Sequence, residues 1–374
     1  MSARSQAKRT YLRSRWDRLN GPSRITGVDL ARGLAVLGMF AAHLLWIEEP
    51  HLTDPSTWLG VVHGRSSILF ATLAGVSIGL ISGGTRPVEG TALRTVRYRL
   101  FFRALFLWLL GVLLIATEVP VYVILPAYGL LFLLAIPLVP LGARALLSLA
   151  AGLAVVMPFV QVWLDDLPIW TDEAGYELGL AIGWHYPFTT WIAFVLAGMG
   201  FARLGVRSLA VQVRMLVVGI ALAAVAYGLD AVARGPEESD VPSYWAKLWT
   251  AQAHSSGLLE VVGSGGFALA VIALCLLVCR TSVRYLVLPI RAVGAMPLTA
   301  YTAQIVAWAI VAAVVIGETD DLVGFRALMP FGAFAVCTLV GCTAWALLVG
   351  RGPLEWLMDT VSRVVARPPR EQAR

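Results

Sequence analysis

Asp29, Arg32 and His43 lie in one apolar run, GVDLARGLAVLGMFAAHLL, which is long enough to cross a bilayer. At about 100° per residue, the spacing of Arg32 and His43 returns their side chains to within about 20° of one helix face. Asp29 precedes Arg32 by about one turn, so the two can pair. A neutral imidazole in this company can take a proton from a hydroxyl or amine, or accept an acyl group as a nucleophile. Because ionisable groups are costly inside a membrane, these residues predict a functional site that faces the protein interior.

The whole chain has the composition of a polytopic membrane protein. Of its 374 residues, 58% are hydrophobic and only 14% are charged, whereas soluble domains carry about 25% charged residues. Because the run 288–316 contains Pro289 and Pro297, we expect it to kink or split, which would make eleven helical pieces. We therefore predict an all-α membrane helix bundle of about 10–11 transmembrane helices. The apolar runs centre on 27–47, 58–82, 100–117, 119–138, 144–163, 187–204, 207–229, 257–279, 288–316 and 326–350.

The basic residues orient this bundle. Of the 29 lysines and arginines, 24 fall on one side of the predicted spans, which the positive-inside rule makes cytoplasmic. An even number of spans then places both termini in the cytoplasm of a multi-pass plasma-membrane protein. We expect a basic tail over 1–25, a transmembrane domain over 26–350 and a second tail over 351–374, with the first span uncleaved. Nucleic-acid binding is not expected, because the basic residues punctuate the spans instead of forming one patch.

All five histidines fall toward the opposite, outer side. Glu260 follows His254 by about a turn and a half inside a predicted span, and its carboxylate needs a partner, for which Arg65 or a histidine is suitable. No two histidines have the i,i+4 spacing of helical metal ligands, so no metal site is predicted. The secondary site candidates share this outer side: His51, His63, Arg65, His254 and Glu260.

Four arginines precede or enter the third predicted span on the basic side, namely Arg94, Arg97, Arg99 and Arg103. Guanidinium groups suit phosphates, so this patch is a candidate site for the phosphates of a coenzyme A. Contact with anionic lipid explains the same residues. The outer segments 165–186 and 231–256 are rich in Trp and Tyr, which can stack on sugar rings or anchor at the membrane interface. These segments can lie on the surface or dip into the membrane.

Longer stretches of the sequence resemble a known family. RITGVDLARGLAVLGMFAAHLL and HGRSSILFATLAGVSIGL resemble bacterial membrane proteins related to the heparan-α-glucosaminide N-acetyltransferase catalytic domain. HYPFTTWIAFVLAGMGFARLG, AHSSGLLEVVGSGGFALAVIALCLL, VGAMPLTAYTAQIV and GPLEWLM resemble the same group. The Arg32–His43 spacing is also similar to the first-helix motif of the acyltransferase-3 family. In the heparan enzyme the key histidine lies in the first outer loop, which makes His51 and His63 second candidates for the catalytic histidine.

The resemblance implies transfer of an acyl group, often acetyl, from cytoplasmic acetyl-CoA to a glycan or other acceptor across the membrane. In this leading hypothesis His43 is the base or acyl carrier, Asp29 and Arg32 orient the site, and the Arg97 region receives the CoA. The alternative is a transporter or flippase in which Asp29, Arg32, His43 and Glu260 form a proton or substrate pathway. The third hypothesis is a structural membrane protein with a satisfied polar network.

Overall fold

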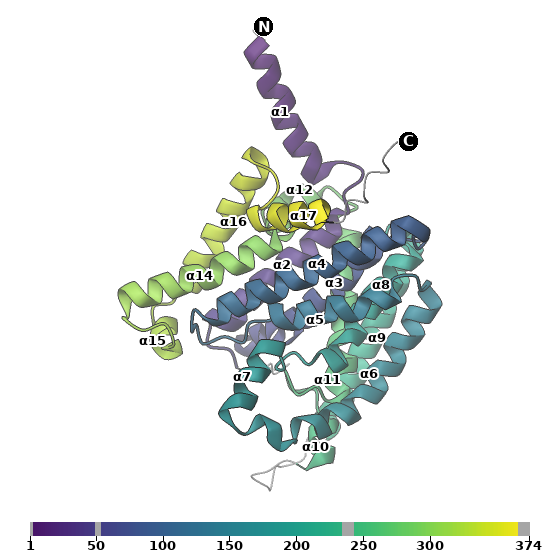
Figure 1. The fold of residues 1–374 in the computed structure, drawn as a ribbon, viewed down its shortest axis with the longest axis vertical. Coiled ribbons are helices and arrows are strands. Elements are labelled where there is room, and N and C mark those ends of the chain that lie inside the picture. The colour runs from purple at the N-terminus through teal and green to yellow at the C-terminus, as the bar shows by residue number, and fades with distance from the viewer. Residues whose placement is uncertain (1–2, 49–53, 234–242, 366–374) are drawn as a thin grey trace, which may run out of the picture.

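The computed structural model of the protein describes residues 3–48, 54–233 and 243–365. Within these ranges the chain forms seventeen α-helices and three 3-10 helices and no strand, which confirms the predicted all-α class (Figure 1). The elements are α1 (Ala3–Asn20), α2 (Thr26–Leu44), η1 (Pro55–Val62), α3 (Arg65–Ile81), α4 (Gly90–Ile115), α5 (Leu125–Ala135), η2 (Ile136–Leu138), α6 (Ala143–Asp165), η3 (Pro168–Trp170), α7 (Glu173–Ile182), α8 (Phe188–Leu204), α9 (Leu209–Ala233), α10 (Tyr244–Leu248), α11 (Leu258–Val278), α12 (Val283–Leu286), α13 (Leu288–Ala295), α14 (Pro297–Val315), α15 (Leu322–Ala327), α16 (Phe331–Leu348) and α17 (Pro353–Val365).

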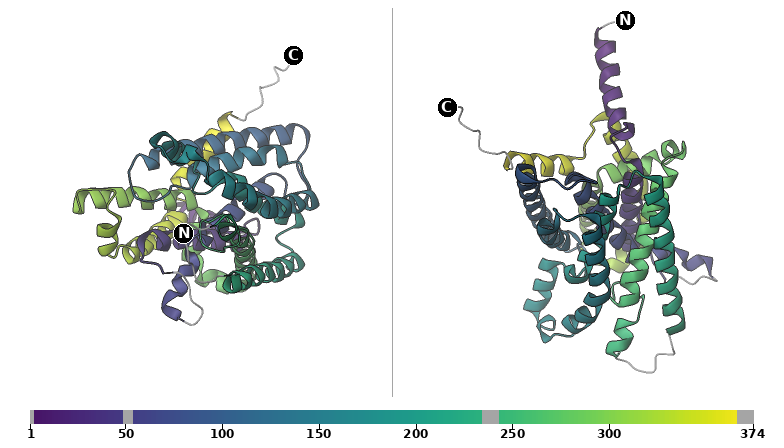
Figure 2. Two further views of the ribbon diagram at one scale, coloured as in Figure 1. Left: turned by 90° about the horizontal axis from the view of Figure 1, so that it is seen from below. Right: turned by 90° about the vertical axis from the view of Figure 1, so that its right-hand side faces the viewer.

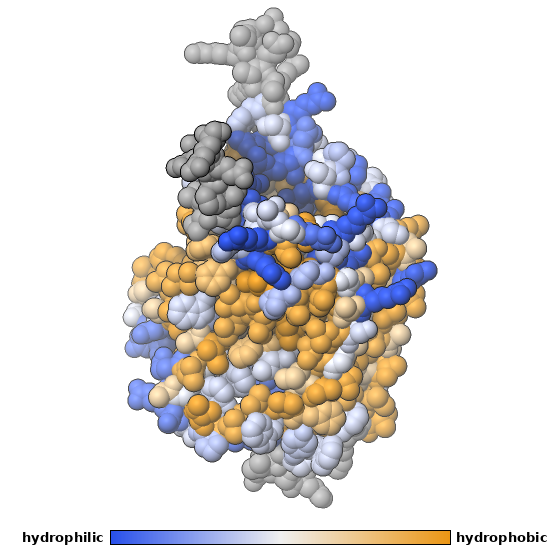
Figure 3. All heavy atoms as spheres, turned by 45° about the vertical axis from the view of Figure 1, so that its right-hand side comes forward, coloured by the Kyte–Doolittle hydropathy of each residue, from blue (hydrophilic) through white to orange (hydrophobic). Residues whose placement is uncertain are grey.

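The membrane-spanning character of the chain is visible in its helices. Eight segments of the described chain are long and apolar enough to cross a membrane, and two shorter apolar helices, Leu125–Leu138 and Phe188–Leu204, accompany them. These ten segments match the ten predicted apolar runs. Apolar side chains form a broad belt between more polar ends (Figure 3), as expected for a surface that faces lipid chains.

The predicted break in the long run 288–316 is present. Helix α13 ends at Ala295 and α14 begins at Pro297, whose ring is suited to the first position of a helix. The Glu355 carboxylate of α17 accepts hydrogen bonds from the backbone N–H groups of Leu298 and Thr299, at 2.8 and 3.1 Å. It therefore caps the free N–H groups of α14 with a negative charge. The segment 351–374, expected to be a tail, thus contains a helix that packs onto the bundle.

Glycine residues allow two pairs of helices to cross at very short range. A Cβ on Gly294 of α13 would lie 1.7 Å from the carbonyl oxygen of Asp29, and one on Gly33 of α2 would lie 2.0 Å from a backbone oxygen of α13. Helices α3 and α8 meet in the same way at Gly75 and Gly198, where a Cβ would lie 1.9 and 2.0 Å from a backbone oxygen of the facing helix. Small residues at such crossings are a common basis of helix association in membranes. These contacts fix the helix that carries the first candidate residues.

Helices α1 and α17 lie at the same end of the bundle, and α1 stands out from it (Figures 1 and 2). We call this end, which carries most of the arginine-rich loops, the inner end. Its assignment to the cytoplasm stays a prediction from the positive-inside rule. The segment 165–186 folds at the other, outer end, where it includes η3 and α7 (Figure 1).

A buried arginine joins the loops of the inner end. Arg203, at the end of α8, is 4% exposed. It donates hydrogen bonds to the backbone oxygens of Gly79 and Gly84 at 2.9 and 2.7 Å, and to that of Val139 at 2.8 Å. Because these acceptors belong to the last turn of α3 and to the α3–α4 and α5–α6 connections, one guanidinium at the end of α8 holds three parts of the chain together.

This network predicts the effect of a substitution. We expect Arg203→Met to lower the stability by about 3 kcal/mol or more, since each buried carbonyl left without a donor costs about 1–3 kcal/mol. Arg144→Met is the matched control, because Arg144 is exposed near the same loop. Thermal unfolding in detergent, followed by tryptophan fluorescence, measures both variants. Equal midpoints for the two variants would contradict a structural role for Arg203.

Candidate functional site

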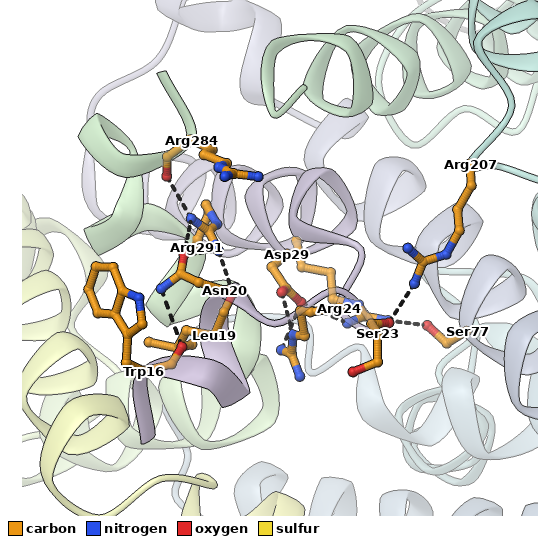
Figure 4. A network of polar contacts seen from close by, with 11 residues as sticks. Trp16, Leu19, Asn20, Ser23, Arg24, Asp29, Ser77, Arg207, Arg284 and Arg291 are labelled. Atoms are coloured by element: carbon orange, nitrogen blue, oxygen red, sulfur yellow. Dashed lines mark hydrogen bonds and ion pairs between the residues drawn. The ribbon is translucent and has the colours of Figure 1, made fainter. Parts of the chain in front are cut away.

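The inner half of α2 carries a charge network around Asp29 (Figure 4). Asp29 is 2% exposed, and its two oxygens accept hydrogen bonds from Arg24 at 2.5 and 2.8 Å. Arg32 lies 3.5 Å from the same carboxylate, so the predicted pair is present, although Arg24 is the nearer partner. Arg32 also donates to the Ser77 hydroxyl of α3 at 2.5 Å. Its side chain as a whole retains 22% exposure.

His43 lies near the outer end of α2, on the face predicted from its spacing to Arg32. The side chains between them on this face are packed: Val36 and Phe40 are fully buried and Met39 is 2% exposed. The two ionisable groups therefore share a helix face and are separated by an apolar layer within it. Because of this packing, Arg32 and His43 do not line one polar chamber.

Two other helices hold His43 in place. Its Nδ1 atom lies 3.4 Å from Nε2 of Gln304 in α14. Arg326 of α15 donates to the backbone oxygens of His43 and Ala42, at 3.0 and 3.3 Å. These oxygens belong to the last turn of α2, where carbonyl groups lack partners within the helix and attract cations. The Arg326 guanidinium thus fixes the end of the helix from which His43 projects.

The histidines gather at the outer end, as the sequence predicts. The His254 ring lies 5.5 Å from that of His63 and 4.6 Å from that of His185, measured between centroids. His43 lies at this same end, one residue before the end of α2. His51 lies outside the described residues. Four of the five histidines thus form one region that extends from the end of α2 to the loop before α8.

Glu260 is satisfied by a loop and not by the expected cation. Its carboxylate accepts hydrogen bonds from the backbone N–H groups of His254 and Ser256, both at 2.6 Å. Both residues have left-handed backbone angles, with φ of 64° and 53°, which turn these N–H groups toward the carboxylate. Arg65 donates instead to the Tyr227 hydroxyl at 2.7 Å. Of the two partners expected for Glu260, the histidine is the one found, through its backbone.

An aromatic cavity of about 190 Å³ adjoins the histidines. His185 lines it and stacks on Tyr122, with ring centroids 3.8 Å apart. Trp170 and Trp184 form another part of the wall and stack at 4.6 Å. A second hollow beside it shares Tyr122 and carries acidic side chains at Glu118, Glu177 and Asp320. Flat aromatic faces together with polar groups suit a ligand that has both apolar ring faces and hydroxyl or amino groups.

The predicted arginine patch is divided between two faces of α4. Arg94 and Arg97 are three residues apart, whereas Arg99 and Arg103 point about 140–180° away from Arg94. Arg103 lies 3.4 Å from Asp359 of α17 and so connects that helix to α4. Within the described residues, the Nε atoms of Arg97 and Arg103 are both buried without a hydrogen-bond partner, but Arg103 already has a carboxylate partner through Nη2. Arg94 and Arg97 are thus the pair of this group best placed for a phosphate ligand.

Several residues near the candidate sites were not predicted. Arg24 lies in the basic segment before the first span, where topology alone accounted for its charge. Gln304 is a lone amide in the apolar run TAQIVAWAI, and an uncompensated polar residue in a span was a usable signal. Arg326 and Ser77 reach α2 through contacts between distant segments, for which the sequence holds no local sign.

Comparison with known families agrees with these observations. The family described as heparan-alpha-glucosaminide N-acetyltransferase, catalytic, matches residues 24–229. A second family, a protein of unknown function (DUF418), matches residues 199–364. No curated protein matches the chain. The first match covers the segment that contains Asp29, Arg32, His43, the arginines of α4 and the aromatic cavity, and it confirms the resemblance found in the sequence.

The buried outer loops predict a pH dependence of stability. Burial, helped by the charge of neighbouring histidines, lowers the pKa of His185 to about 4 and that of His254 to about 3. In the unfolded chain both groups titrate near pH 6.5. The unfolded state therefore binds more protons between these values, so stability is full above about pH 6.5 and decreases as the pH falls toward 4.

The measurement is the thermal midpoint in detergent from pH 7.5 to pH 4.5, for the wild type and His254→Asn. Asparagine tolerates the left-handed backbone angle and does not titrate in this range. We expect a smaller decrease of the midpoint with pH in the variant. Parallel curves would show that His254 does not contribute to acid destabilisation.

Proposed function

The chain belongs to the family of the heparan-alpha-glucosaminide N-acetyltransferase catalytic domain, and from this we propose that it is a plasma-membrane acetyltransferase. In this proposal acetyl-CoA is the donor and enters from the cytoplasm, and the acceptor is a hydroxyl or amine of a glycan on the outer side. The observation that carries the proposal is the position of His43. It lies in the matched segment and near the outer end of α2, the end of the bundle at which His63, His185 and His254 gather.

The donor requires a cationic inner end and a route to His43. Arg94 and Arg97 offer guanidinium groups for the CoA phosphates, and Arg32 lies further along α2 with part of its side chain exposed. The distance from Arg32 to His43 along the helix is about 16 Å, which an extended pantetheine arm can span. Because Val36, Met39 and Phe40 fill this face, the thioester reaches His43 only when these side chains or the adjoining helices move apart.

His43 acts as the general base in the transfer we propose. Its imidazole nitrogen takes the proton of the acceptor hydroxyl or amine while the acceptor atom forms a bond to the thioester carbonyl carbon. The electron pair of the carbonyl π bond moves to the oxygen, which gives a tetrahedral intermediate. When this intermediate collapses, the C–S bond breaks and the proton held by His43 passes to the CoA sulfur. The products are the acetylated acceptor and CoA, and His43 is neutral again.

The acceptor is proposed to bind in the aromatic cavity. Trp170, Trp184 and Tyr122 present ring faces on which a sugar can stack. His185 lies in the cavity wall and is linked through His254 to His63. The acetyl group therefore passes from the thioester at the end of α2 to an acceptor held between that end and α7.

The role of His43 is tested by comparing His43→Gln with His63→Gln. Removing the general base is expected to lower the rate of acetyl transfer by about 10²–10⁴-fold, whereas His63→Gln should stay within severalfold of wild type. The assay follows radiolabelled acetyl groups from acetyl-CoA to a panel of glycan acceptors, with purified protein in liposomes. Loss of activity in the His63 variant with activity retained in the His43 variant would move the assignment to His63. Solute uptake without an acetylated product would favour a transporter.

The donor site is tested by Arg97→Met, with Arg99→Met on the other face of the same helix as control. We expect the first substitution to raise the Kd for acetyl-CoA by about tenfold, because a charge-assisted hydrogen bond contributes about 1.5–3 kcal/mol. The second should leave it nearly unchanged. Calorimetric titration of acetyl-CoA measures both values. Equal Kd values for the two variants would show that the phosphates bind elsewhere.

A further inference from the structure

The contact between His43 and Gln304 determines which imidazole nitrogen is available for chemistry. Gln304 is 2% exposed and lies in α14, within a membrane-spanning helix. Burying an amide in this setting is costly unless its groups find partners. Its contact to Nδ1 of His43, at 3.4 Å, joins α14 to α2 through two residues that are 261 positions apart in the chain.

The orientation of the amide sets the tautomer of the ring. With the Gln304 nitrogen toward Nδ1, the imidazole must accept through Nδ1 and carry its proton on Nε2, so Nε2 has no lone pair for a substrate. In that arrangement the Gln304 oxygen is buried without a partner within the described residues. A 180° rotation of the amide exchanges its oxygen and nitrogen without moving other atoms. The oxygen then accepts from Nδ1–H, and the lone pair of Nε2 is free.

Trp308 adds a second observation on the same helix. It follows Gln304 by one turn and so lies on the same face of α14. It is fully buried, it stacks on Phe325 with centroids 4.6 Å apart, and within the described chain its indole N–H has no hydrogen-bond partner. With the rotated amide, the Gln304 NH₂ group takes the buried position of the unpartnered oxygen, one turn before the Trp308 N–H, which in the described chain is a buried donor without an acceptor. A buried donor without an acceptor costs about 1–3 kcal/mol, which a ligand oxygen would recover.

We propose that Gln304 is the positioning residue that holds His43 as its Nδ1–H tautomer, and that the N–H groups of Gln304 and Trp308 bind the carbonyl oxygen of the acyl group. This assignment rests on the proposed acetyl transfer. As the acceptor attacks, the carbonyl π electrons move to this oxygen, and two preorganised N–H donors in a water-poor site stabilise the charge that develops there. The ligand class is a thioester or acyl carbonyl, and no further co-reactant is needed.

The first experiment reads the tautomer without any reaction. Protein labelled with ¹⁵N-histidine is studied by NMR in detergent at neutral pH, and the His43 signals are assigned by their loss in His43→Gln. We expect a protonated Nδ1 in the wild type and in Gln304→Glu, which keeps the acceptor oxygen, and a shift toward protonated Nε2 in Gln304→Met. A wild type with the proton on Nε2, or a Gln304→Met variant with an unchanged tautomer, would overturn the assignment. This result is independent of whether the protein transfers acetyl groups.

The second experiment separates positioning from binding. Gln304→Met is expected to lower kcat by about 10²-fold with little change in the KM for acetyl-CoA, and Gln304→Glu should restore the tautomer but not kcat, because its carboxylate offers no N–H to the carbonyl oxygen. Trp308→Phe keeps an aromatic ring to stack on Phe325, and we expect it to lower kcat by about 10-fold or more while the His43 tautomer stays as in the wild type. A Trp308→Phe variant with unchanged kcat would remove Trp308 from the proposal. If Gln304→Met does not fold, as judged by its thermal midpoint, Gln304→Asn serves in its place, because its shorter amide cannot reach Nδ1.

Discussion

The cost of placing ionisable groups among apolar helices determines how this protein is built. Two such groups, Asp29 and Glu260, are paired by devices that also position a helix. Asp29 is held by Arg24 and Arg32 at the start of α2. Glu260 is held by a loop of backbone N–H groups at the start of α11. The partners of these two carboxylates offset the cost of burying them, and the same contacts hold the ends of α2 and α11 in place.

The two ends of α2 are fixed in different ways, and this difference suits one end to binding a donor and the other to admitting reactants. At the inner end, ion pairs and the glycine crossing with α13 leave little freedom, because Gly294 touches the backbone of Asp29. At the outer end, the helix is held by Arg326 on its last carbonyls and by the amide of Gln304 on the His43 ring. A rigid inner end suits binding of a charged donor, and an outer end held by side chains on α14 and α15 suits a site that must admit reactants.

The fold was predictable from the sequence where one physical signal dominated. The length of apolar runs indicated the ten helical segments, and Pro297 indicated the break before α14, because proline cannot continue a helix. Helix periodicity likewise predicted the Asp29–Arg32 pair.

The partners of His43 were not predictable, because Gln304 and Arg326 reach α2 from distant segments. Glu260 was expected to pair with Arg65 or a histidine, yet its partners are backbone N–H groups, which left-handed angles at His254 and Ser256 turn toward it. Residue types do not reveal this feature of loop geometry. The four arginines of α4 were treated as one patch because they are close in sequence, whereas the helix rotates them onto two faces.

The apolar layer between Arg32 and His43 is a consequence of this design and constrains any transfer mechanism. Val36, Met39 and Phe40 fill the face of α2 between its two ends, and under the proposed function this layer separates the cytoplasmic thioester from the outer side. A donor that binds at the inner end can displace these side chains with its own apolar pantetheine arm, so the burial lost by the layer is regained against the ligand. The acceptor does not have to cross the layer, because His43 lies at the outer end of α2. Under the proposed function, the thioester donor therefore opens the apolar layer as it binds. The layer stays closed to water and to the acceptor.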